Sequence, residues 1–316
     1  MVASSGPGST DPAAGVPPDN DPADPLAEDE PLIDAAAERK QARRERRQLL
    51  LKSPAFIAGA IIVGFWVLCA LVPDLLTRYD PSESLRTVSP RSGPSSEAWF
   101  GTDRIGRDVY SRVIAGAREV LKVSPLAAGL GVLGGTMLGL IVGYYRGWID
   151  EVIGRIIDGF LSIPLILLAV LVSAVFTVTD TVLIIMIAAL FTPVVARTIR
   201  SVVIGESELD YVTSAKLRGE SGPYIMVREI LPNITGTIVV ELTVRIGYAI
   251  FTVATLAFLG LVGDISTADW GTYINQTYPN LQSDQWWMSI FPGIAIASLI
   301  IGINLIADSI DRVNKA

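Results

Sequence analysis

Six long apolar runs, separated by polar segments, divide this 316-residue chain. Each run is close to the roughly 20 residues that a helix needs to cross the hydrocarbon core of a bilayer. A soluble amphipathic helix would instead repeat its apolar residues every three or four positions. The pattern predicts an all-α membrane protein with six transmembrane helices, at 55–75, 125–145, 156–176, 181–203, 235–262 and 288–310.

The charged residues are distributed unevenly between the segments that separate these runs. Residues 1–36 hold eight acids and no base and are rich in Pro, Ala, Gly and Ser. This tail is expected to be disordered, because it can bury too little apolar surface to offset the entropy of ordering. A basic flank, 37–53, follows with seven Lys or Arg residues, directly before a first helix at 54–76.

Lys and Arg accumulate on the cytoplasmic side of membrane proteins, which sets the expected orientation. With both termini in the cytoplasm, the inner segments carry 16 bases and the outer loops carry eight, all eight in the loop 77–123. These charged flanks argue against buried core helices of a large soluble protein. They also favour an interpretation of 37–53 as a topogenic flank that meets membrane lipid, with no nucleic acid bound. The remaining spans form a transmembrane domain at 124–312.

The residue inventory excludes most catalytic chemistry. The chain has no histidine, its single cysteine is Cys69, and it contains no G-x-x-x-x-G-K-[ST] phosphate-binding loop. No catalytic residue, metal site or bound cofactor is therefore expected in this chain. If ATP drives its function, another polypeptide must hydrolyse the ATP.

Several residues inside the predicted spans have possible roles. The second span carries glycines four residues apart on one helix face: Gly131, Gly135, Gly139 and Gly143. Such a face lets another helix approach closely, so a packing seam is favoured over a lining of the permeation path. In the fifth span, Glu241 and Arg245 are expected to pair, either at the interface or as a functional site. Pro164 and Pro193 can each kink a span.

The segment 206–233, between the fourth and fifth spans, is predicted to form a helical hairpin on the cytoplasmic face. Glu208 and Asp210 near its start suit a helix N-terminus, and Gly219 is a typical helix stop. A second short helix is expected over 222–230, before Pro232 interrupts the helical path. Such a hairpin can act as a rigid lever that passes the movement of a partner protein to two spans.

This segment also resembles a known motif. Its residues read Asp210-Tyr211-Val212-x-Ser214-Ala215-x-x-x-Gly219, then Leu231-Pro232-Asn233. This pattern resembles the EAA loop of ABC-importer permeases, although Thr213 stands where a glutamate is usual. In that family the loop holds the coupling helix that inserts into the ATP-binding subunit. The resemblance assigns ATPase coupling to Glu208, Asp210, Tyr211, Ser214, Ala215, Gly219, Leu231 and Pro232.

The loop after the first span carries a second motif, which reads Gly101-Thr102-Asp103-x-x-Gly106-Arg107-Asp108. Its glycines are turn signals, and ion pairs among Asp103, Arg107 and Asp108 could fix the loop. The string resembles the signature of the C-type subunit of the dipeptide/oligopeptide/nickel permease family, and it implies an extracytoplasmic scaffold. Further resemblances to that family lie at 257–261, 269–271, 291–293 and 304–308.

The resemblance covers about 50–312 and implies a type I ABC-importer permease fold in a bacterial inner membrane. It implies a homologous B-type permease, two ATP-binding subunits or domains that use ATP and Mg, and an extracytoplasmic substrate-binding protein as partners. Di- or oligopeptides are the default cargo, with nickel or glutathione as alternatives. A secondary, ion-coupled transporter is the alternative class, and Glu241 is its one deep acidic candidate. An intramembrane enzyme is disfavoured by the residue inventory.

Overall fold

The computed structural model describes residues 48–262 and 268–315 of the chain. The acidic tail 1–36 and most of the basic flank 37–53 therefore lie outside the described residues. Within the described ranges, regular structure is helical, and strand-like pairing is limited to two isolated bridges, Ser84 with Arg107 and Thr102 with Asp108. The all-α class is confirmed.

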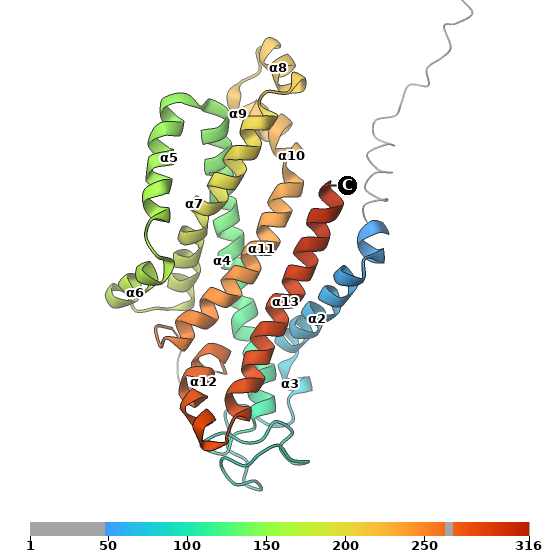
Figure 1. The fold of residues 1–316 in the computed structure, drawn as a ribbon, viewed down its shortest axis with the longest axis vertical. Helices are drawn as coiled ribbons and strands as arrows, with labels where there is room; N and C mark the ends of the chain where they lie inside the picture. Colours follow the sequence, from blue (N-terminus) through green and yellow to red (C-terminus); the bar gives the residue numbers. More distant parts are fainter. Residues whose placement is uncertain (1–47, 263–267, 316) are drawn as a thin grey trace, which may run out of the picture. The chain divides into compact units, whose positions relative to one another are not determined.

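Five helices of the described ranges are long and apolar enough to cross a membrane alone (Figure 1). They are α2 (Pro54–Leu71), α4 (Val109–Tyr145), α7 (Asp180–Glu206), α11 (Thr235–Phe258) and α13 (Trp287–Lys315). A bent pair, α5 (Gly147–Leu161) with α6 (Leu165–Val175), forms a sixth candidate crossing. Short helices connect them: α3 (Pro73–Leu76), α8 (Asp210–Leu217), α9 (Gly222–Tyr224), η1 (Ile225–Ile230), α10 (Leu231–Asn233), α12 (Trp270–Thr277) and η2 (Tyr278–Ser283).

The third predicted span differs most from its expected form. It begins at Gly147 instead of residue 156, and α5 meets α6 at an angle of 84°. The break falls at Ser162–Pro164, where Pro164 lacks a backbone N–H and disfavours helical geometry in the residue before it. The Ser162 hydroxyl also donates to the Gly159 carbonyl at 2.7 Å. One straight helix over 156–176 is therefore replaced by two.

The second predicted span is part of a longer helix. α4 begins at Val109, and its 37 residues span about 55 Å, well beyond the roughly 30 Å of the hydrocarbon core. Its start is fixed by Asp108, whose carboxylate accepts a hydrogen bond from the Ser111 backbone N–H at 3.0 Å. The first turns of α4 therefore belong to the predicted loop 77–123. Pro125 lies inside the helix without ending it.

The helices pack around α4. α7 makes the most extensive contact with it, α11 packs on both α4 and α13, and α2 packs on α13 and α4 (Figure 1). The four glycines of the seam each face a residue of α7: Phe191, Val195, Ile199 and Val203. A Cβ atom added at Gly135 would lie 2.5 Å from the Val195 Cβ. The backbones of α4 and α7 therefore approach closely about once per turn along the shared face, where glycine leaves room.

Candidate functional site

The 206–233 segment forms a hairpin at one end of the helices, opposite the 77–108 loop (Figure 1). Its first limb, α8, ends with Arg218 as C-cap. Gly219 follows with φ +80°, a left-handed conformation that glycine adopts without the steric cost of a Cβ atom. No atom of another residue lies within 4 Å of a Cβ built there, so the turn is open on its outer side.

The second limb is longer than expected. Helical geometry runs through α9, η1 and α10 to Asn233, and the first non-helical residue is Ile234, with φ −92° and ψ 3°. The expectation that Pro232 interrupts the helix is therefore wrong. Ile225–Ile230 has the wider turn of a π-helix, and the helical path continues past Pro232.

Burial divides the expected coupling residues into two groups. Ala215 is fully buried with Val212, against Ile225 and Ile230 of the second limb and Val203 of α7. Tyr211 and Leu231 are half-buried beside them. The remaining five are exposed: Glu208, Asp210, Ser214, Gly219 and Pro232. One face of α8 thus holds the hairpin to its own chain, and the other is free.

Polar contacts fix the base of the hairpin. The Tyr211 hydroxyl donates to the Glu206 carboxylate at 2.6 Å, and burial together with this hydrogen bond raises the pKa of Tyr211 to about 12. Arg146, at the corner between α4 and α5, donates to the Glu208 carboxylate at 3.0 Å and to the Ile204 carbonyl at 2.8 Å. Movement of the hairpin is therefore linked to α4, α5 and α7.

At the opposite end, the signature loop is organised around one carboxylate. Asp103 is 1% exposed and accepts hydrogen bonds from the backbone N–H groups of Ile105 and Arg107, at 3.0 and 2.9 Å. It also pairs with the Arg107 guanidinium at 2.7 Å. Asp108 caps α4 instead of joining this ion pair. The expected ion pairing is thus limited to two of the three residues.

Two tryptophans anchor this loop and the start of α4: Trp270, which belongs to the resemblance at 269–271, and Trp287, which sequence reasoning did not single out. The Trp287 indole N–H of α13 donates to the Thr102 carbonyl at 3.2 Å. The Trp270 indole N–H of α12 donates to the Val113 carbonyl at 2.8 Å. A Cβ atom at Gly101 would lie 2.7 Å from the Trp287 nitrogen, so this ring packs directly on the loop backbone. An indole N–H in an apolar stretch requires an acceptor, which is the signal that could have identified both rings.

Asp103→Asn is expected to loosen the signature loop. The substitution leaves the largely buried Arg107 without its countercharge, which costs up to about 3 kcal/mol. Limited proteolysis of the loop in detergent-solubilised protein should show faster cleavage than in wild type. Asp80→Asn is the matched control, because Asp80 is exposed and its partners, the hydroxyl and N–H of Ser82 that lower its pKa, are local. Equal cleavage of both variants would contradict the role of Asp103.

The fifth-span pair is also brought together. The Arg245 guanidinium donates to the Glu241 carboxylate at 3.0 Å, and both side chains are 14% exposed. Arg245 also lies over the rings of Phe191 and Tyr248, at 5.8 and 5.4 Å from their centres. Its charge is therefore balanced within the chain. Among the described residues, no group of three or more acidic or cysteine side chains could hold a metal ion.

The chain is similar to known transport proteins over most of its length. Residues 135–315, more than half of the chain, match the family described as binding-protein-dependent transport system inner membrane component. The chain is 37% identical to the dipeptide transport system permease protein DppC of Alkalihalophilus pseudofirmus, over 84% of this chain and 87% of that protein. It is 32% identical to the glutathione transport system permease protein GsiD of Pectobacterium atrosepticum, over 84% and 86% respectively.

This chain belongs to the family of binding-protein-dependent transport system inner membrane components. It is a membrane-spanning permease subunit of an ABC importer, with the type I permease fold expected from its sequence. The resemblance drawn from the two loop motifs is confirmed, and the alternative of an ion-coupled secondary transporter is set aside.

Proposed function

We propose that this chain is the C-type permease subunit of an importer that moves di- or oligopeptides across the inner membrane. The observation that supports a peptide cargo is the 37% identity to a dipeptide permease over most of both chains. The similarity to glutathione permeases is consistent with this cargo, since glutathione is itself a small peptide with free charged ends. Neither of the two relatives named above is described as a nickel transporter.

The proposed subunit translocates its cargo and catalyses no reaction itself. A homologous B-type permease completes the pathway, an extracytoplasmic binding protein delivers peptide, and two ATP-binding subunits or domains hydrolyse ATP with Mg. Both termini and the 206–233 hairpin face the cytoplasm, and the 77–108 loop faces outward. The fixed inner face and free outer face of α8 support its role as the coupling helix. The buried signature loop supports a scaffold role, with its exposed rim available to the binding protein.

Uptake assays test the cargo directly. In membrane vesicles that contain the complete importer, radiolabelled di- and tripeptides should accumulate in an ATP-dependent manner, and unlabelled peptides should compete. Uptake of nickel or of glutathione alone, unaffected by excess peptide, would contradict the peptide assignment.

Gly219→Asp tests the coupling role. The added side chain projects into open space beyond the hairpin turn and places a negative charge where the ATPase would dock. The variant chain should accumulate nearly normally, because the added Cβ atom meets no other residue and the left-handed conformation costs a non-glycine residue only about 1–2 kcal/mol. ATP-dependent peptide uptake should fall by about tenfold or more. Gly205→Asp, also in open surroundings at the end of α7, is the comparison. Normal uptake by the Gly219 variant at normal expression would argue against coupling through α8.

A further inference from the structure

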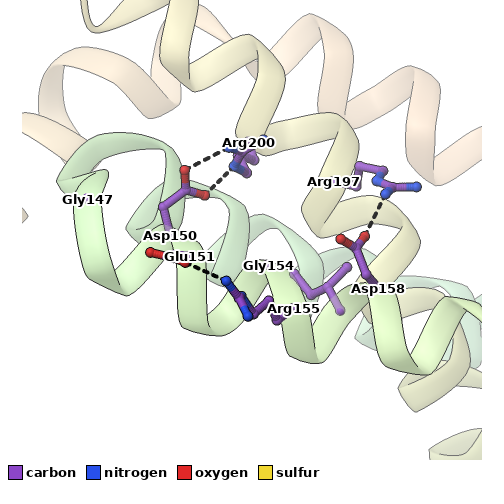
Figure 2. A pocket seen from close by; sticks show the side chains of 9 residues that line it. Gly147, Asp150, Glu151, Gly154, Arg155, Asp158, Arg197 and Arg200 are labelled. Carbon is purple, nitrogen blue, oxygen red and sulfur yellow. Dashed lines mark hydrogen bonds and ion pairs between the residues drawn. The ribbon is translucent and has the colours of Figure 1, made fainter.

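A groove of mixed charge lies between α5 and α7 (Figure 2). Its volume is about 360 Å³. Three carboxylates and three guanidinium groups line it, together with two glycines and one isoleucine: Asp150, Glu151, Asp158, Arg155, Arg197, Arg200, Gly147, Gly154 and Ile157. Neither of the two sequence motifs nor the fifth-span pair contributes to it.

Two ion pairs cross the groove at separate levels. Arg200 of α7 holds Asp150 of α5 through two hydrogen bonds, at 2.5 and 2.7 Å. Arg197 holds Asp158 at 2.6 Å, and both of these side chains are about 60% exposed, at 63% and 60%. Gly154 lies between the two levels, and a Cβ atom built there would meet no other residue within 4 Å. The middle of the groove is therefore open (Figure 2).

α5 presents its exposed apolar residues away from the groove. Every fourth residue along one stripe is large, apolar and between 49% and 74% exposed: Trp148, Val152, Ile156 and Phe160. Positions 150, 154 and 158 lie about 200° around the helix from this stripe. A helix with an exposed apolar stripe and an opposing charged stripe has its lipid or protein contact on the apolar side. The charged side must then face an environment other than the one that the apolar stripe contacts.

Arg197 and Asp158 both lie more than two turns from the ends of α7 and α5 that are next to the hairpin. Arg197 lies nine residues before the end of α7, about 14 Å along the helix, and Asp158 lies about 16 Å from the start of α5. A charged side chain that faces lipid is energetically costly. Ionisable groups on membrane-spanning helices therefore face a bundle interior or a water-filled cavity.

We infer that the α5–α7 groove lines the water-filled inner half of the translocation pathway, where its charges pair transiently with both ends of a passing peptide. This inference rests on the proposed function. A peptide with free termini carries an ammonium group and a carboxylate, which match Asp158 or Asp150 and Arg197 or Arg200. The two aspartates lie about 12 Å apart along α5, which an extended peptide of three or four residues spans.

Exchange of partners in this groove is energetically inexpensive. The Arg197–Asp158 pair is exposed, and exposed ion pairs are weak, so a peptide terminus can replace one partner of this pair without a large barrier. A site of this kind binds weakly, which suits a pathway that must release its cargo. Because each carboxylate has a guanidinium beside it, the groove balances the charge of a zwitterion and does not retain a simple cation or anion.

Cysteine labelling tests whether the groove faces water. In a Cys69→Ser background, Gly154→Cys and Phe160→Cys place one thiol in the groove and one on the apolar stripe of the same helix. A membrane-impermeant maleimide added to inside-out vesicles of the complete importer should label the Gly154 variant roughly tenfold faster, because thiols in apolar surroundings react slowly. A saturating tripeptide should slow labelling at Gly154 only. Equal labelling at both positions, or protection of Gly154 in the absence of peptide, overturns the inference and indicates that the partner permease fills the groove.

Transport kinetics test the charge pairing separately. The Asp158→Asn and Arg197→Gln double variant should raise the KM for a tripeptide with free termini about tenfold. It should leave the KM for the same tripeptide with blocked termini unchanged. Equal effects on both peptides would overturn the pairing. If Gly154→Cys is labelled as expected but no peptide is transported even by wild type, then the peptide assignment fails while the pathway assignment stands. If wild type transports peptide but the maleimide does not label Gly154→Cys, the pathway assignment fails while the peptide assignment stands.

Discussion

Gly135→Leu is expected to prevent stable accumulation of this permease in the membrane, whereas Gly129→Leu on the same helix is expected to be tolerated. A Cβ atom at Gly135 would lie 2.5 Å from the Val195 Cβ and 2.8 Å from the Thr192 carbonyl oxygen. One of these contacts is with backbone, so a change of side-chain rotamer cannot relieve it. Overpacking by single methylene groups already costs about 1–3 kcal/mol, and leucine adds four carbons.

The control position is chosen to separate crowding from helix chemistry. At Gly129 no other residue lies within 4 Å of an added Cβ, and one turn away Leu133 is already 58% exposed. Quantitative immunoblots of membranes, and thermal unfolding of the detergent-solubilised chain, measure both variants. Gly135→Ala should give an intermediate loss of stability, about 1–3 kcal/mol. Similar accumulation of the Gly135 and Gly129 leucine variants would contradict the close approach of α4 and α7.

The glycine spacing illustrates what periodicity can predict. A four-residue repeat on one span is enough to expect a close helix contact, because the face it defines follows from helix geometry alone. It cannot name the partner, since that depends on how the spans are arranged. The structure supplies α7, whose Phe191, Val195, Ile199 and Val203 share the same four-residue spacing. With hindsight, this matched repeat was the only trace of the pairing in the sequence.

The hairpin illustrates a different limit. Gly219 ends α8 as expected, because a left-handed residue after a helix is a local requirement that the residue type reveals. The burial of Ala215 is not local, since small residues serve equally well against the chain itself or inside a partner's cleft. The motif resemblance assigns all eight residues to one contact with the ATPase, and burial divides them into two groups.

The groove beside the third span could not be predicted for a related reason. Arg155, Arg197 and Arg200 were counted as charges that set the orientation, and their pairing with acids of α5 was not considered. Asp150 and Asp158 are eight residues apart and therefore share a helix face, which was a usable signal. It was obscured because the span was placed at 156–176, which excluded Asp150 and the first turns of α5.

The two faces of α8 are expected to give opposite results with the same substitution, aspartate. Ala215 is fully buried against the hairpin and α7, and an unpaired carboxylate there costs several kcal/mol. Ala215→Asp should therefore reduce accumulation of the chain itself. Leu217 is 85% exposed, so Leu217→Asp should leave accumulation unchanged.

Leu217→Asp should act on the proposed ATPase partner instead. A leucine side chain that becomes fully buried in an interface contributes about 1.5–3 kcal/mol, so its loss should weaken association by roughly ten- to a hundredfold. Recovery of the ATP-binding subunit with the tagged permease, normalised to permease recovered, measures this effect. Reduced accumulation of the Leu217 variant, or selective loss of the ATPase from a normally accumulating Ala215 variant, would reverse the assignment of the two faces. In that case Ala215 would face the partner, and the packing of α8 on α7 would have to open during coupling.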